Sequence, residues 1–335
     1  MRVFVAGGTG AIGRPLVAQL VARGHDVVAT TRSAAKAGEL RALGADAVVV
    51  DGLDAAAVRE AVVSAAPDAI VHQMTALSGT PDLRRFDRWF AATNALRTRG
   101  TRNLLDAAQA AGVRRFVAQS YTGWPNARTG GPVKTEDDPL DPDPAPAQRE
   151  TAAAIRFVEE AVTAAPLDGV VLRYGGFYGP GASESLVELV RKRRLPIVGA
   201  GGGVWSWLHV DDAASATVAA LESDATGIFN VVDDDPAPVA QWLPDLAQVV
   251  GAKPPRHVPV WVGRLLGGEA VVRMMTEARG SSNAKIKREL GWQPRYASWR
   301  DGFRHGLTRD GERNSPRSGG RDLPEPPGLR GAAHG

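Results

Sequence analysis

Three glycines near the start of the chain have the spacing of a phosphate-binding loop. Gly7, Gly10 and Gly13 recur at every third position in "GGTGAIG", after a short apolar run and before an amphipathic segment. Without side chains, the backbone can turn tightly and approach a pyrophosphate, which the free amides and the dipole at a helix N-terminus favour. We therefore expect a pyrophosphate-binding loop made of Gly7, Thr9, Gly10, Ala11, Ile12 and Gly13.

A second group of reactive side chains lies in "QSYTGW", where Ser120, Tyr121 and Thr122 present three hydroxyl groups. They follow an apolar run that is typical of a strand, and ligands bind at the carboxyl ends of parallel strands. A tyrosine can exchange a proton with a substrate oxygen that neighbouring hydroxyls orient. We expect Tyr121, Ser120 and Thr122 to be catalytic. An open alternative is that Ser120 only packs beside the ligand and Tyr121 fills a gap.

The elements that would position these groups alternate along the first half of the chain. Apolar runs predict strands, helical periodicity predicts the segments between them, and Gly24 ends the first helix. This alternation predicts an α/β fold, a Rossmann-type doubly wound parallel sheet. The expected strands are 2–7, 25–32, 46–51, 68–74, 114–120 and 169–176, with helices at 34–43, 54–65 and 86–111 and a further one from about Gln148.

After residue 178 the pattern changes to short strands, prolines and aromatic residues. We expect residues 1–178 to form the Rossmann domain and residues 179–309 to form a smaller C-terminal α/β substrate lobe, interleaved with the last strands of the sheet. Residues 310–335 are rich in Gly, Pro and Arg and almost without apolar periodicity. This composition predicts a disordered tail.

Composition limits the class of protein further. The 335 residues carry a net charge of only +3, include no cysteine and contain no run near the ~20 apolar residues of a membrane span. We expect a soluble, cytoplasmic protein that binds neither nucleic acid nor a membrane. No metal site is expected, because thiolates are absent and His72 and His209 have no partner at ligand spacing.

Several longer segments share one family pattern. "VVVDGLD", "GTRNLLDAAQAAGVRRFV", "LRYGGFYGPG" and "WLHVDDAA" together resemble the extended short-chain dehydrogenases/reductases of the NAD-dependent epimerase/dehydratase family, over about residues 1 to 308. The resemblance implies an NAD(P)-binding Rossmann domain, a small-molecule substrate and a surface that would allow a homodimer. Beyond the glycine loop, it assigns to the cofactor Asp51, Gly52, Met74, Thr75, Ala76, Ser120, Tyr174 and Gly175.

The end of the second expected strand favours NADP over NAD. NAD-binding members of the family carry an acid there, whereas this chain has "TTRSAAK". Arg32, Ser33 and Lys36 could bind a 2′-phosphate, and no carboxylate would repel it.

The chain departs from the family at its catalytic residues. The resemblance places Ala147 and Thr151 where the family has its tyrosine and lysine, and no tyrosine or lysine lies between Lys134 and Tyr174. Arg97 replaces a usual asparagine, although Asn94 lies one turn earlier. Trp205 replaces the arginine that grips a nucleotide-sugar pyrophosphate, which argues against a sugar epimerase.

The sequence therefore predicts an NADP-dependent oxidoreductase acting on a small, partly apolar carbonyl, alcohol or activated double bond. Aromatic residues suit such a substrate. The first alternative is a non-catalytic NADP-binding redox sensor or regulatory protein, and the second is an NAD-dependent epimerase/dehydratase. The residues expected to contact substrate are Trp124, Phe177, Tyr178 and Trp205.

Overall fold

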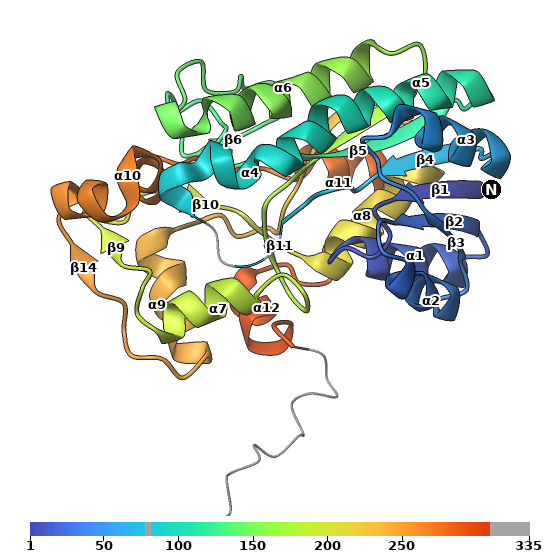
Figure 1. The fold of residues 1–335 in the computed structure, drawn as a ribbon. Helices are drawn as coiled ribbons and strands as arrows, with labels where there is room; N and C mark the ends of the chain where they lie inside the picture. The colour runs from blue at the N-terminus through green and yellow to red at the C-terminus, as the bar shows by residue number, and fades with distance from the viewer. Residues whose placement is uncertain (78, 80–81, 309–335) are drawn as a thin grey trace, which may run out of the picture.

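A sheet of seven parallel strands forms the centre of the molecule, in the order β12-β7-β5-β4-β1-β2-β3 (Figure 1). The chain winds outward in both directions from β1, so the carboxyl ends of β1 and β4 meet at the switch point, where such sheets bind ligands. The predicted doubly wound fold is confirmed. The strands are β1 (Arg2–Ala6), β2 (Asp26–Thr31), β3 (Asp46–Val49), β4 (Ala69–His72), β5 (Arg115–Tyr121), β7 (Asp168–Tyr174) and β12 (Gly227–Val231).

Helices cover both faces of this sheet, which is why its central strands are continuous apolar runs. Leu16 and Leu40 pack on one face, and Val62 and Leu104 pack on the other. The first face carries α1 (Gly13–Ala22), α2 (Ala34–Ala42), α8 (Val210–Glu222) and α11 (Ala284–Leu290). The second carries α3 (Ala55–Ala65), α4 (Phe86–Ala95), α5 (Thr101–Ala111) and α6 (Arg149–Ala164).

The single helix expected over 86–111 is interrupted. A π-helical turn, η2 (Leu96–Gly100), separates α4 from α5. The hydroxyls of Thr98 and Thr101 donate to the carbonyls of Asn94 and Arg97, four residues back in each case. Such side-chain bonds compete for the acceptors of the helical ladder, and π-turns are frequent at functional sites.

The later part of the chain builds a second apolar cluster beside the carboxyl edge of the sheet, around Trp207, Trp242 and Trp299. The helices of this region are α7 (Glu184–Arg191), α9 (Val239–Val249), α10 (Val260–Thr276) and α12 (Trp299–His305). Short strands pair as β8 (Gly176–Tyr178) with β11 (Trp207–His209), β9 (Ile197–Val198) with β14 (His257–Val258), β10 (Val204–Trp205) with β13 (Ala237–Pro238), and β6 (Val133–Lys134) with β15 (Gly280–Ser281). Two 3₁₀ turns are η1 (Leu83–Arg85) and η3 (Pro146–Gln148).

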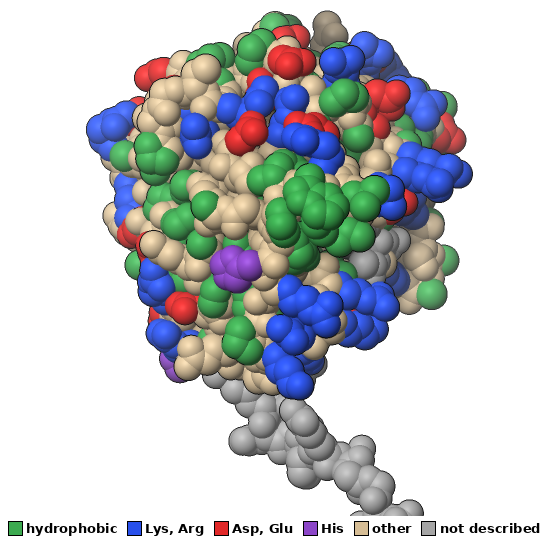
Figure 2. Space-filling view, turned by 90° about the vertical axis from the view of Figure 1, so that its left-hand side faces the viewer, with side chains coloured by type: hydrophobic (Ala, Val, Ile, Leu, Met, Phe, Trp, Pro, Cys, Tyr) green, Lys and Arg blue, Asp and Glu red, His purple; other side chains and the backbone are tan. Residues whose placement is uncertain are grey.

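These coordinates come from a computed structural model that describes residues 1–77, 79 and 82–308. The tail expected at 310–335 lies outside the described residues. None of the described helices is long and apolar enough to cross a membrane. Apolar side chains gather on one face between patches of Lys and Arg (Figure 2). On α10, Trp261, Leu265 and Leu266 are 67%, 66% and 61% exposed.

Candidate active site

The turn between β1 and α1 needs its glycines for two different reasons. Gly7 has φ +97°, and a Cβ on it would lie 2.7 Å from the backbone oxygen of Gln73. A Cβ on Gly13 would lie 2.2 Å from the oxygen of Gly7, so both positions must stay bare for the chain to pack. A Cβ on Gly10 would meet only the Gly7 oxygen, at 3.5 Å, and would point into open space. That space beside the N-terminus of α1 suits a pyrophosphate.

A cleft of about 830 Å³ opens in front of this turn, within the usual range of small-molecule sites. It extends from β1 and β2 across β4 to the start of α7. Trp89, Leu96, Gln119 and Glu184 line it without having been predicted. Of the residues expected to bind the cofactor, those that line the cleft are Gly7, Thr9, Gly10, Ala11, Ile12, Gly13, Arg32, Gly52, Met74, Thr75 and Ala76.

The other five expected cofactor residues lie outside the cleft. Tyr174 is buried, and its hydroxyl accepts from Gln73 at 3.0 Å and lies 2.7 Å from the Thr217 hydroxyl. Gly175 packs against Ser206, because a Cβ there would be 2.6 Å from the Ser206 oxygen. Asp51 accepts from the amide of Leu53, and Ser33 precedes α2. Ser120, the fifth, points toward α6.

The end of the cleft beside β2 is basic. Thr31, Arg32 and Lys36 line it there. Among the described residues that line the cleft, Glu184 alone carries a carboxylate, and that group accepts from the amide of Gly181 at 2.7 Å. This part of the site therefore attracts anions.

The hydroxyls of Ser120 and Thr122 are both engaged within the protein. Ser120 donates to Glu159 at 2.8 Å, and Glu159 forms a buried ion pair with Arg173 at 2.7 Å. Thr122 donates to Asn126 at 3.1 Å and lies 2.6 Å from the Ser281 hydroxyl. Ser120 and Tyr121 are successive residues of β5, so their side chains point to opposite faces of the sheet. Both hydroxyls thus have partners within the protein, and a catalytic role for them stays a prediction.

Tyr121 lies in a small pocket that is separate from the large cleft. It shares this pocket with two residues expected to contact substrate, Trp124 and Trp205, and with Met274 of α10. The void between them is about 10 Å³, room for about one water molecule. Among the described residues, none forms a hydrogen bond with the Tyr121 hydroxyl. Burial raises the pKa of Tyr121 to about 12, which makes it a weak acid.

The other two residues expected to contact substrate lie in different places. Phe177 lines the large cleft. Tyr178 is fully buried among His209, Tyr296 and Phe303, at the centre of the second apolar cluster. A Cβ on Gly302 would overlap the Tyr178 hydroxyl, so this ring contacts α12 and not the cleft. Tyr178 therefore lies away from the cleft, and its contact with substrate stays a prediction.

The position expected for a lysine is closed. Thr151 is fully buried, and its hydroxyl donates to Asp87 at 2.6 Å and accepts from Asn94 at 3.0 Å. Asp87 also accepts from the amides of Thr151 and Glu150 at 2.9 and 3.0 Å, and so caps α6. Ala147 lies in η3, directly before α6. Neither Ala147 nor Thr151 therefore offers an acid, a base or a cation.

A cation does lie nearby, on η2. Arg97 is 8% exposed, and its guanidinium stands 5.8 Å from the ring centre of Phe90. Its side chain makes one hydrogen bond among the described residues, a 3.5 Å contact with Asn94, and its Nε has no partner. Burial lowers the pKa of Arg97 to about 10, and the nearby Tyr121 partly offsets this effect.

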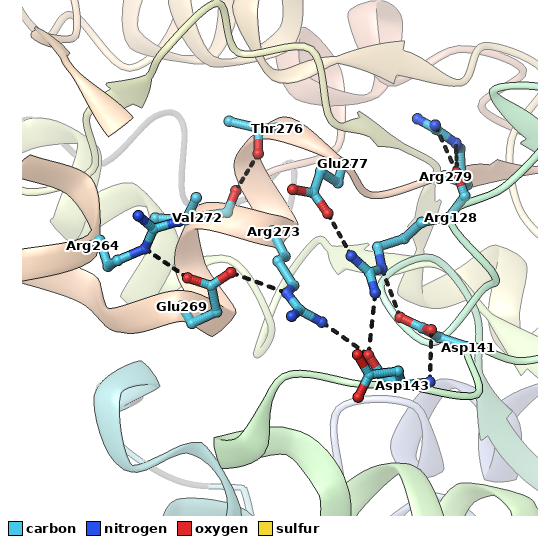
Figure 3. A network of polar contacts seen from close by, with 10 residues as sticks. All are labelled: Arg128, Asp141, Asp143, Arg264, Glu269, Val272, Arg273, Thr276, Glu277 and Arg279. Atoms are coloured by element: carbon cyan, nitrogen blue, oxygen red, sulfur yellow. Dashed lines mark hydrogen bonds and ion pairs between the residues drawn. The ribbon is translucent and has the colours of Figure 1, made fainter. Parts of the chain in front are cut away.

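A network of ion pairs holds the wall behind Trp124. Arg128 pairs with Asp141 at 2.8 Å and with Glu277, just after α10, at 2.7 Å. Arg273 of α10 donates to the backbone oxygen of Asp143 at 2.9 Å (Figure 3). These bonds tie α10, which carries Met274, to the loop that follows β5.

The two histidines considered for metal binding have structural partners. His72 accepts from the amide of Met74 at 3.2 Å, and burial lowers its pKa to about 4. His209 accepts from the amide of Asp211 at 3.1 Å at the start of α8. In the part of the chain that the structure describes, no group of His, Asp and Glu could hold a metal ion.

Comparison with known proteins gives relatives along most of the chain. The model of the NAD-dependent epimerase/dehydratase family matches residues 3–231. A 3-diazoavenalumate denitrifying reductase from Streptomyces sp is 49% identical over 311 residues, 90% of this chain and 99% of the relative. A 2-alkyl-3-oxoalkanoate reductase from Stenotrophomonas maltophilia is 31% identical over 75% of this chain and 76% of its own length.

Solved structures share the fold. The UDP-glucose 4-epimerase of Thermus thermophilus, solved in complex with NAD, is similar with a TM-score of 0.70 and 26% identity. The match covers 94% of this chain and all of that one. The likeness therefore extends through the later region that carries Trp205 and α10.

Proposed function

The chain belongs to the NAD-dependent epimerase/dehydratase family, and on that premise we propose that it is an NADPH-dependent reductase of an aromatic diazo compound, which it converts to the arene with release of N₂. The oxidoreductase class follows from its reductase relatives. The substrate class rests on the 49% identical denitrifying reductase and on one feature of this site. That feature is the loss of both proton-handling residues, at Ala147 and Thr151.

Reduction of an arenediazonium ion needs a hydride and no proton. A C–H bond forms at the ring carbon, the C–N bond breaks, and its electron pair leaves with N₂. One reduced nicotinamide is oxidised for each arene formed. A carbonyl, in contrast, takes up a proton on oxygen in the same step. A site without a tyrosine–lysine pair is therefore adequate for the diazonium and poor for the carbonyl.

Residues of the chain would bind and orient the two reactants. Nicotinamide nucleotide, when bound, supplies the hydride. The turn from Gly7 to Gly13 fits its pyrophosphate, and the space at Gly10 is left free for it. Phe177, which lines the large cleft, would flank an aromatic ring there and exclude water, which attacks diazonium ions.

The choice of NADP is part of the proposal. Arg32 and Lys36 line the cleft at the end of β2, where no carboxylate lies among the described lining residues. A guanidinium binds a phosphate through paired, charge-assisted hydrogen bonds, which a ribose hydroxyl cannot match.

Deuterium labelling tests the reaction. We expect the protein with NADPH to reduce an arenediazonium probe faster than NADPH alone does, and deuterium at C4 of the cofactor should appear on the ring carbon that carried nitrogen. Gly10→Val, whose Cβ would meet only the Gly7 oxygen at 3.5 Å and whose side chain should fill the expected pyrophosphate space, serves as the inactive control. Deuterium taken from D₂O into that C–H bond, or a rate equal to the control, would contradict the proposal.

Carbonyl reduction is the second candidate, favoured by the 31% identical oxoalkanoate reductase and by the position of Tyr121. Tyr121→Phe separates the two functions. Loss of a general acid should lower carbonyl turnover at least a hundredfold and leave diazonium turnover within about twofold. Because burial raises the pKa of Tyr121 to about 12, the phenol stays protonated at all lower pH values and its role shows no titration near neutrality. Full carbonyl turnover by the variant would exclude Tyr121 as the acid.

A non-catalytic redox sensor has less support. The relatives over most of the chain are named as reductases. The large cleft also continues past the glycine turn to Gln119 and Phe177, which leaves room for a second small molecule beside the cofactor.

A further inference from the structure

The lining of the large cleft includes a hydrogen-bond acceptor without a donor. Gln73 directly follows β4, is 5% exposed and lines the cleft. A Cβ on Gly7 would lie 2.7 Å from the backbone oxygen of Gln73, so this residue lies beside the start of the glycine turn. None of the described residues donates a hydrogen bond to the side-chain Oε1 of Gln73. Buried polar atoms almost always have a partner, so we expect a donor from a bound molecule.

A series of hydrogen bonds fixes which end of this carboxamide is free. The hydroxyl of Thr217 donates to the carbonyl of Ala213 at 2.8 Å. A hydroxyl has one proton to donate, so Thr217 must accept from the Tyr174 hydroxyl, 2.7 Å away. Tyr174 has then used its own proton and must accept from Nε2 of Gln73, at 3.0 Å. The amide nitrogen is thus engaged with Tyr174, and the oxygen remains for another partner.

A second carboxamide lines the cleft on the adjacent strand. β4 and β5 are parallel, with His72 opposite Ala118, and Gln73 and Gln119 are the next residues along the two strands. Gln119 is 8% exposed, and its Nε2 donates to the carbonyl of Met74 at 3.5 Å, which is a weak bond. This part of the cleft therefore offers an acceptor from Gln73 and a weakly engaged donor from Gln119.

We propose that these two glutamines bind the carboxamide of the nicotinamide ring, with Oε1 of Gln73 accepting from its NH₂ group and Nε2 of Gln119 donating to its carbonyl. The proposal rests on the proposed cofactor and is independent of the diazo substrate. The pyrophosphate has no N–H or O–H group to donate at neutral pH, so it does not suit a free acceptor. The proposed contact of Arg32 with the 2′-phosphate assigns the adenosine half to the other end of the cleft. A planar amide, with a donor and an acceptor side by side, matches two neighbouring glutamine amides.

Tyr174 is a positioning residue in this arrangement. Its hydroxyl is buried and orients Gln73, so it would act on the cofactor without touching it. A nicotinamide carboxamide held at both of its polar atoms cannot rotate freely with its ring about the bond to the ribose. One face of the ring would therefore be presented to the substrate.

Two cofactors that differ only at the carboxamide test the proposal by calorimetric titration, without turnover. 3-Acetylpyridine adenine dinucleotide phosphate has a methyl group in place of NH₂, so it keeps the carbonyl but offers Gln73 no donor. We expect the parent protein to bind NADP⁺ about three- to tenfold more tightly than this analogue. Gln73→Leu should remove that preference, and Tyr174→Phe should reduce it. Gln119→Leu should weaken both cofactors equally, because both keep the carbonyl. Gln109→Leu, at an exposed site on α5, should behave as the parent.

The adenosine half of the cofactor separates binding from folding. 2′,5′-ADP, which has no nicotinamide, should bind the parent and Gln73→Leu equally. Gln73→Leu should also melt at the temperature of the parent, because it leaves Tyr174 bonded to Thr217. A marked fall in melting temperature, or a loss of 2′,5′-ADP affinity, would show that Gln73 has a structural role and overturn the proposal.

Three further results would contradict it. Equal affinity of the parent for NADP⁺ and the analogue would show that the NH₂ group is not recognised. An equal loss of both cofactors in Gln73→Leu would assign this residue to the ribose. A parent protein that binds neither NADP⁺ nor 2′,5′-ADP would contradict the proposed cofactor and this inference together. Binding as expected without diazonium turnover would support the inference and count only against the proposed reaction.

Discussion

The proposed preference for NADP depends most on one side chain, Arg32. It is exposed at the end of β2 and faces the cleft with Lys36. We expect Arg32→Ala to weaken NADP by roughly ten- to a hundredfold, because one charge-assisted contact contributes about 1.5–3 kcal/mol, and to leave NAD nearly unchanged. Titration of both cofactors measures this. Arg41→Ala, an exposed arginine at the other end of α2, is the matched control, and a parent protein with equal affinities would refute the assignment.

Thr151 carries a prediction about stability. Thr151→Lys buries an ammonium and breaks the hydroxyl's bonds with Asp87 and Asn94, so we expect the free energy of unfolding to fall by about 1–3 kcal/mol. Urea denaturation checks the value. Thr163→Lys, at an exposed site on the same helix, should stay within about 0.5 kcal/mol. Equal stability of the two variants would show that the lysine position is still open.

Single residues differ in how well the sequence predicts them. The glycine turn is predicted because its geometry leaves few alternatives to glycine. The direction of Ser120 is not predicted, because a hydroxyl at the end of a strand can lie on either face of the sheet. Its parity with Phe116 and Ala118, which pack under the helices of the second face, was the signal that it points toward α6. The place of Tyr178 is hard to predict for another reason, because an aromatic residue near a ligand site can equally well belong to the core.

Among the elements, α10 is tied most directly to the pocket that the proposed function assigns to substrate. Arg128 joins the loop after β5 to Glu277, and α10 supplies Met274 to the pocket of Tyr121 and Trp124. Arg128→Ala should loosen this wall, and we expect about three- to tenfold weaker substrate binding with NADP affinity within about twofold, because independent sites rarely couple. Arg264→Ala removes an exposed pair with Glu269 on the same helix and should have no such effect. An equal loss of cofactor affinity in Arg128→Ala would mean that the two sites are coupled.

Helical periodicity located α4 and α5 but not the π-turn between them. Apolar residues such as Leu96 and Leu104 continue on one side through the break, so the sequence looks like one helix. At this turn the hydroxyls of Thr98 and Thr101 donate hydrogen bonds to backbone carbonyls. Their effect on the helix is visible only once its backbone hydrogen bonds are known. The sequence shows that Arg97 replaces a usual asparagine. Its burial could not be predicted, because the π-turn that widens the helix at this point was not.

For the whole molecule, the doubly wound arrangement of the strands is predictable from the sequence. The division of the chain into a Rossmann domain and a smaller lobe is less predictable. Residues beyond 178 return to the sheet as β12 and cover its first face with α8 and α11. Amphipathic spacing shows that a helix has a buried side but not what that side packs against. The boundaries at residues 178 and 309 and the expected homodimer stay predictions.

The hydrogen bonds around Thr151 also bear on the history of the protein. A descendant that acquired the family's catalytic pair would need both a lysine at this position and a tyrosine at Ala147. The lysine alone disrupts bonds to Asp87 and Asn94 at the start of α6, and the tyrosine alone lacks its activating charge. Each single step is thus neutral or harmful, so selection offers no gradual path back. Relatives that share Thr151 and its two partners should therefore also lack a tyrosine at the position of Ala147.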